Sequence, residues 1–200
     1  MNFFDKNFTK EQGGFTLMEM VVVLAIFTMS SVIIANIFIT LINTQHKIIT
    51  QQKVLSEARY AINIMSRNIR MGTISYNDYS SIQTPYENEL YLKDIDGNKN
   101  FFKLCDTTGD CVESCPADVE KCLIMSIDEG ANWESITSKN IEIQDLRFYI
   151  RPTNDPFDDG SPNIQPRVSI LLNIKNSSAL SHYRSEIVLQ SNMSTRIYNR

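Results

Sequence analysis

Charged side chains are missing from a long stretch of this 200-residue sequence: no Asp, Glu, Lys or Arg occurs between Met20 and His46. Most residues of the stretch are Val, Ile, Leu, Met, Phe or Ala. A helix that crosses a bilayer needs about 20 apolar residues, and this stretch is longer than that. A bilayer therefore has to be part of any functional interpretation.

Helix-breaking residues are also missing from the first third of the chain. No proline precedes Pro85, and no glycine lies between Gly14 and Gly72. Nothing in that interval should interrupt a helix. We predict one helix from Phe15 to about Met71, closed by Gly72. At about 1.5 Å per residue, such a helix would be roughly 85 Å long.

The predicted helix changes character along its length. Up to about Ile42 it is apolar on all sides, as helices in lipid or in helix bundles are. Beyond that point its apolar residues fall on one face, which is predicted to be buried against the rest of the chain. The predicted stripe consists of Ile48, Leu55, Ala58, Ile62, Met65 and Ile69.

A basic surface is missing from the rest of the chain. Residues 72–200 hold 12 basic and 19 acidic side chains, a net charge of −7. A grip on nucleic acid that is independent of sequence needs a basic surface. No nucleic-acid partner is therefore expected.

Catalytic patterns are missing as well. His46 and His182 are the only histidines, and neither lies near a plausible Ser or Cys partner in the sequence. There is no Gly-x-Ser-x-Gly, no phosphate-binding loop and no His-Glu-x-x-His. Trp133 is interpreted as a core or loop residue rather than a ligand-binding one. We expect no enzyme activity and no cofactor.

Short extended segments follow Gly72. The first two flank an Asp-Gly turn, which indicates a hairpin. The predicted strands are Leu90–Lys93, Phe101–Leu104, Leu123–Ile127, Ile141–Ile150, Arg167–Ile174 and Glu186–Tyr198. The order predicts an α+β fold, in which one long N-terminal helix packs on a C-terminal antiparallel β-sheet domain.

The four cysteines lie in one stretch: Cys105, Cys111, Cys115 and Cys122. A zinc ribbon or finger has two pairs of ligands, each with about two to four residues between its members. The two pairs lie further apart in the sequence than these cysteines allow. In an exported domain an even, clustered number of cysteines indicates two disulfides, which we favour over a metal site. Four cysteines allow three pairings, and the sequence leaves all three open.

Six residues open the apolar stretch: Gly14, Phe15, Thr16, Leu17, Met18 and Glu19. With the apolar helix that follows, this motif resembles the type IV filament superfamily, which comprises type IV pilins and type II secretion pseudopilins. The resemblance implies that a prepilin peptidase cleaves between Gly14 and Phe15 and methylates the new amino group of Phe15. An ordinary secretory signal would instead have a shorter apolar core and a cleavage site after that core.

The resemblance also implies a type IV pilin-like fold and a division of the chain. Residues 1–14 would be a cytoplasmic leader, and residues 15–42 the transmembrane and polymerisation helix. Residues 43–72 would be the amphipathic helix half packed on the head. Residues 73–200 would form an extracytoplasmic β-rich head with a cysteine loop at 105–122. The implied partners are the prepilin peptidase, the inner (cytoplasmic) membrane, and other pilin or pseudopilin subunits, reached in the filament through their N-terminal helices.

Glu19 is an acidic residue at the edge of the apolar segment. A charge inside a bilayer costs about 2.5–3.5 kcal/mol at its centre, so such a residue is a functional candidate. In a staggered bundle Glu19 could pair with the freed amino group of Phe15 on a neighbouring subunit, which would offset desolvation and fix register. The alternative is a carboxylate in the headgroup region that acts as an N-terminal helix charge.

Other segments resemble one subclass of the superfamily. Residues 55–72 are similar to the helix end of PilW-type minor pilins and J-class minor pseudopilins. The C-terminal strand pattern also resembles that of these proteins, at Leu146–Tyr149, Pro166–Val168 and Ser194–Arg196. Major pilins often have a kinking proline in the apolar half, which is absent here. We favour a minor subunit that initiates or caps a filament. The alternative is a pilus-tip adhesin or binding module that uses the cysteine loop, and less favoured are a major pilin and a membrane-tethered extracytoplasmic enzyme.

Two weaker features remain. The segment Asp94–Asn100 superficially resembles a calcium loop, but its glycine is misplaced for an EF-hand, and a hairpin turn is favoured. Asp155, Asp158 and Asp159 crowd one loop. Some pseudopilins bind calcium in a distal loop, so this loop is a weak calcium candidate against a solvated acidic loop. The basic residues of 47–71, which include Arg67 and Arg70, form a solvated face or pair with acidic heads of neighbouring subunits.

Overall fold

A computed structural model describes residues 13–79, 82, 85–106, 114–116, 119–158, 164–177 and 184–196. The chain divides into two compact units, Met1–Gln45 and His46–Arg200, and α1 (Leu17–Met71) contributes to both. The elements after α1 are β1 (Thr73–Ile74), the 3-10 helix η1 (Tyr76–Asp78), β2 (Glu89–Lys93), β3 (Lys99–Asp106), β4 (Lys121–Ser126), β5 (Glu134–Ser135), β6 (Ile141–Arg151), β7 (Arg167–Asn176) and β8 (Glu186–Ser194).

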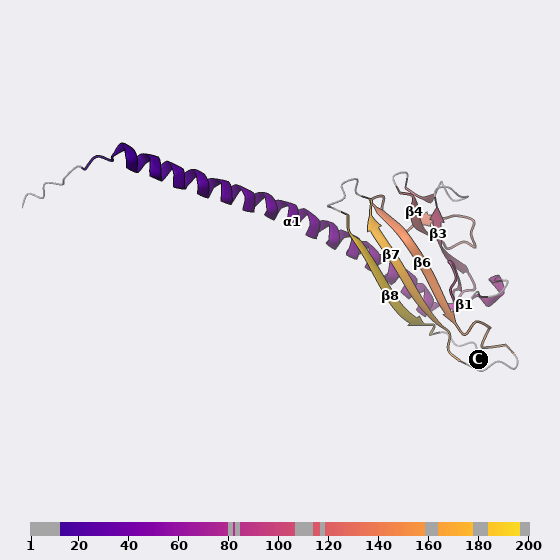
Figure 1. Cartoon of the computed structure of the whole chain (residues 1–200). Helices are drawn as coiled ribbons and strands as arrows, with labels where there is room; N and C mark the ends of the chain where they lie inside the picture. The colour runs from indigo at the N-terminus through magenta and orange to yellow at the C-terminus, as the bar shows by residue number, and fades with distance from the viewer. Residues whose placement is uncertain are drawn as a thin grey trace, which may run out of the picture. The chain divides into compact units, whose positions relative to one another are not determined.

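The strands form two antiparallel sheets rather than a single one (Figure 1). Sheet A has the order β1-β2-β3-β4-β5, and sheet B has the order β6-β7-β8. Glu87 joins them, because its backbone exchanges two hydrogen bonds of 2.8 Å with Phe148 on β6. The α+β fold predicted from the sequence, one long helix followed by antiparallel strands of a type IV pilin-like layout, is confirmed.

The predicted hairpin is present at β2 and β3. The Asp94 N–H donates to the Asn98 carbonyl, and the Gly97 N–H donates back to Asp94. Gly97 has a φ of +89°, a conformation that glycine adopts without a steric penalty. The final strand is shorter than predicted and ends at Ser194. The short strands β1 and β5 were not predicted, since two residues carry too little pattern.

The head has one main core, in which α1 packs against both sheets. The five buried residues of α1 are Val54, Ala58, Ala61, Met65 and Ile69. The predicted stripe was therefore wrong in part: it lacked Val54 and Ala61 and contained Ile48, which is 46% exposed. The two buried alanines lie on the face that packs against the sheets, where small side chains allow a close approach.

Gly72 follows the last residue of α1, as predicted. Helices often close with a glycine at positive φ, yet Gly72 is not among the positive-φ glycines of the described chain. A Cβ on Gly72 would lie 2.8 Å from the Lys93 carbonyl oxygen and 3.0 Å from that of Asn68. Glycine is therefore required because the backbone of β2 passes too close for any side chain.

Candidate functional site

The segment before α1 is open and accessible. Gly13 and Gly14 are exposed, and a Cβ added to either would meet no atom within 4 Å. Phe15 is 76% exposed. A protease needs an accessible backbone, and this segment provides one.

The helix α1 begins at Leu17, two residues later than the predicted start at Phe15, and Thr16 precedes it. Its side-chain oxygen accepts a hydrogen bond from the Glu19 N–H at 3.2 Å, and its carbonyl accepts one from the Met20 N–H at 3.2 Å. A Thr followed three residues later by Glu is the capping-box signature. Because Thr16 caps the helix, α1 starts at Leu17 and not at Phe15.

Glu19 lies in the first turn of α1 and is exposed. A negative charge there is favourable, since the first turn carries the positive end of the helix dipole. This geometry fits the simpler of the two sequence interpretations. The pairing of Glu19 with a neighbour's amino group involves a second chain and stays a prediction, as do cleavage after Gly14 and methylation of Phe15.

The first part of α1 is apolar and exposed. In the described part of the chain one helix, α1, is long and apolar enough to cross a membrane. Its most apolar segment of 18 residues contains no buried residue. Its hydroxyl groups are satisfied within the helix: Thr28, Ser30, Ser31, Thr40 and Thr44 each donate to a carbonyl three or four residues earlier. A helix in hydrocarbon has to satisfy its polar groups internally in this way.

The cysteines form a second cluster on the head. Cys115 and Cys122 are joined by a disulfide, with their Cα atoms 5.8 Å apart. Cys105 is also in a disulfide and lies directly opposite Cys122 across β3 and β4. Cys111 lies outside the described residues. The predicted disulfide is thus confirmed for Cys115 and Cys122. The sequence had left the pairing of the cysteines open.

A metal site is the alternative for these cysteines. The sulfur atoms of Cys105, Cys115 and Cys122 lie within 4.8 Å of one another. A cysteine binds a metal as a thiolate, and a sulfur in a disulfide has no thiolate to offer. In the structure these sulfur atoms are therefore close together because they form disulfides, not because they bind a metal.

The disulfide cluster covers the outer face of sheet A. Cys105, Cys122 and Ile124 are fully buried there, with Cys115 and Trp133 packed against them. The Lys103 ammonium lies 4.3 Å from the centre of the Trp133 ring. Trp133 is therefore part of this small outer core, as expected for a structural tryptophan.

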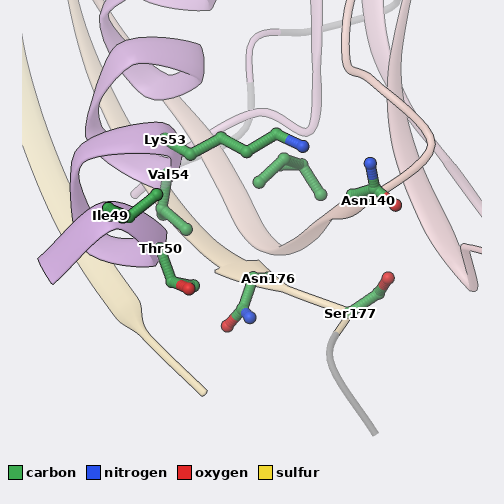
Figure 2. Close-up of a pocket in the computed structure, with 8 residues that line it drawn as sticks. Ile49, Thr50, Lys53, Val54, Asn140, Asn176 and Ser177 are labelled. Carbon is green, nitrogen blue, oxygen red and sulfur yellow. The ribbon is translucent and has the colours of Figure 1, made fainter. Parts of the chain in front are cut away.

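A groove of about 320 Å³ lies between α1 and one end of sheet B. Figure 2 shows Lys53 extending from α1 toward Asn140, with Asn176 and Ser177 at the end of β7. The backbone of Ser177 donates to the Asn140 carbonyl at 2.9 Å, and the side chain of Asn176 accepts from the Ser185 N–H at 2.6 Å. These polar groups hold the strand ends together, and the lining residues include neither a carboxylate nor an imidazole.

The weak calcium candidates are only partly described. Asp155 accepts a hydrogen bond from the Phe157 N–H at 2.9 Å, as in a local turn, and Asp158 is exposed. Asp159 and His182 lie outside the described residues. Among the residues that the structure does describe, no group of three carboxylates converges on Asp155. Calcium binding stays a prediction.

Comparison with known proteins identifies the N-terminal segment. Residues 9–35 match the family model for the prokaryotic N-terminal methylation motif. No curated protein and no solved structure matches the chain. The matched residues include Gly14, Phe15 and Glu19 and run into the exposed apolar part of α1. The chain therefore carries a type IV pilin-like methylation signal at the start of a long helix that leads into an antiparallel β head.

Proposed function

We propose that this chain is the precursor of a type IV pilin-like structural subunit rather than an enzyme. The observation that carries the proposal is the position of the methylation motif, which sits at the capped start of an exposed apolar helix. An apolar surface of this extent needs either lipid or other apolar helices around it. A subunit that waits in the inner membrane and then enters a helical bundle satisfies both needs in turn.

The proposed division of the chain follows from this role. Residues 1–14 are removed by a prepilin peptidase, and Phe15 becomes the methylated N-terminus. Residues 15–42 anchor the chain and later polymerise, while residues 43–72 pack on the extracytoplasmic head formed by 73–200. The subunit is a minor one that helps to initiate or cap a pilus or pseudopilus. The absence of proline in the apolar half of α1 supports the minor over the major role.

Mass spectrometry of the mature chain tests the proposal. Co-expression with a prepilin peptidase should yield a protein that begins at Phe15 with one added methyl group. Gly14→Val should block this processing, and Gly13→Val is the matched control. Because a Cβ at either glycine contacts nothing, neither change should alter folding. A mature protein that still begins at Met1, or that is trimmed past residue 42, would overturn the proposal.

The assembly role of Glu19 is tested separately. In Glu19→Gln the amide can still accept hydrogen bonds, so the helix start is kept while the charge is lost. We expect the variant to be processed but to enter filaments poorly. Normal incorporation of Glu19→Gln would leave only the role of an N-terminal helix charge.

A tip adhesin is the second candidate function. The disulfide cluster with Trp133 and Lys103 gives sheet A a covalently stabilised outer face, which favours an exposed contact surface. Deleting the whole 105–122 segment would not be a fair test, because it removes the end of β3 and the start of β4. Replacing residues 107–110 with serine is milder. Loss of attachment with normal filament assembly would favour the adhesin.

A further inference from the structure

Two arginines face each other at one end of sheet B. Arg151 is the last residue of β6, Arg167 is the first of β7, and the two are direct cross-strand partners. Both are exposed. Side chains at such positions have Cβ atoms about 4.5–5.5 Å apart, and like charges placed there destabilise the pair. This repulsion is unexpected in a head with a net charge of −7.

Neither arginine forms an ion pair with an acidic side chain of the described part of the chain. The four ion pairs there join Lys99 to Asp78, Lys121 to Asp106, Arg147 to Asp145, and Lys175 to Glu142. Neither Arg151 nor Arg167 takes part in them.

More positive charge lies at the same end of the head. The Arg196 N–H, two residues past β8, donates to the Arg70 carbonyl at 3.2 Å, and both side chains are exposed. Thr195 donates through its N–H to the carbonyl of Pro166, next to Arg167. The ends of α1, β6 and β8 and the start of β7 therefore bring four arginines to one region.

A groove of about 370 Å³ adjoins the arginine pair. It is lined by Ile164, Gln165, Arg167, Asn192, Met193 and Ser194. Ser194 is the β8 partner of Arg167, so Arg151, Arg167 and Ser194 form one row across the three strands. The groove thus combines a guanidinium group with amide and hydroxyl groups that donate hydrogen bonds.

We propose that this arginine row, Arg151 and Arg167 with the adjoining groove, binds a short acidic protein segment through its carboxylates. A guanidinium group binds a carboxylate through two parallel hydrogen bonds, and a carboxylate between two arginines removes their repulsion. The heads are acidic, so a neighbouring subunit of similar composition can supply the segment. The identity of that neighbour rests on the proposed function, whereas the preference of the row for carboxylates does not.

Charge favours a protein segment over nucleic acid. A duplex presents a dense line of phosphates, and its binding requires many basic contacts over an extended surface. The head as a whole has a net charge of −7, and Asp155 and Asp158 follow Arg151 closely in the chain. A short segment needs only a few contacts and avoids the rest of the acidic surface.

Binding of a labelled peptide to the full-length chain in detergent tests the proposal. The probe is a decapeptide rich in Asp and Glu, and its control replaces them with Asn and Gln. We expect the acidic peptide to bind and added salt to weaken it. Each of Arg151→Gln and Arg167→Gln should weaken it about tenfold, as for the loss of a charge-assisted hydrogen bond. The matched control is Lys93→Gln with Lys139→Gln, which removes two exposed charges elsewhere on the head.

Thermal unfolding supplies a second readout. Without peptide, Arg151→Gln should raise Tm, because it removes the like-charge contact. The peptide should raise Tm of the parent but not of the double arginine variant. Equal binding of the amide peptide, unchanged binding by the double variant, or tighter binding of inorganic phosphate or a DNA duplex would each overturn the proposal. The unprocessed chain is used throughout, so a failure of N-terminal processing leaves this result intact.

Discussion

The two halves of α1 share one backbone geometry but differ in what surrounds them. From Leu17 to Gln45 no side chain is buried, although most are large and apolar. From His46 to Met71 five residues are buried on one face. Both halves are helical, so the difference lies in the partner: the second half packs against the two sheets, whereas no described residue buries a side chain of the first half. An apolar residue therefore stabilises the head only in the second half.

Truncating one apolar side chain in each half of α1 tests this contrast most directly. Met65 is fully buried, and Met65→Ala should lower the free energy of unfolding of the head by about 2–5 kcal/mol through the cavity it leaves. Ile33→Ala removes a comparable apolar volume from an exposed position and should leave the unfolding of the head unchanged. Thermal unfolding of the full-length chain in detergent, followed by near-ultraviolet circular dichroism, measures both. Equal destabilisation by the two variants would contradict the comparison.

A smaller effect is expected at the outer face of sheet A. The Cys115–Cys122 disulfide closes a loop with a sequence separation of 7. Replacing both cysteines with serine should cost about 2–3 kcal/mol on a chain-entropy estimate. Trp133, the only tryptophan, packs against this cluster, so its fluorescence reports the local change. Peptide mapping of the parent should recover Cys115 joined to Cys122. A different pairing, or unchanged unfolding of the double serine variant, would remove the structural role of this disulfide.

The sequence predicted the features that depend on local pattern. The absence of glycine and proline correctly predicted an uninterrupted helix to Met71, and the Asp-Gly turn correctly predicted the β2–β3 hairpin. The methylation motif was recognised from Gly14 to Glu19 because its residues are contiguous. The spacing of Thr16 and Glu19 also matches the capping-box signature, which is a sequence signal for a helix start at Leu17.

Features set by tertiary packing could not be predicted in the same way. Nothing local distinguishes Ala61, which is buried, from Ile48, which is exposed, since the distinction depends on where the sheets end. The division into two sheets depends on pairings between distant segments. The arginine row required the register of β6 and β7, because Arg151 and Arg167 are separated in sequence by a long loop. The groove at Lys53 likewise brings together α1 and the strand ends.

A still smaller effect is expected on the pH dependence of stability, and it concerns a loop of the head. The Asn132 backbone N–H donates to Asp128 at 2.8 Å, and the Ser126 hydroxyl donates to the same oxygen at 2.7 Å. These hydrogen bonds, the backbone one first, hold the pKa of Asp128 below its usual value.

A lowered pKa in the folded state stabilises the fold above the unfolded-state pKa of about 3.9. That contribution is lost as pH falls through the folded-state pKa. Acidification should therefore lower Tm of the parent more steeply than that of Asp128→Asn, whose side chain does not titrate. Parallel Tm curves below pH of about 4 would show that this loop contributes nothing to the acid sensitivity of the head. A change such as Ile33→Ala in the first half of α1 should leave the same curve untouched, because no titratable group lies between Met20 and Gln45.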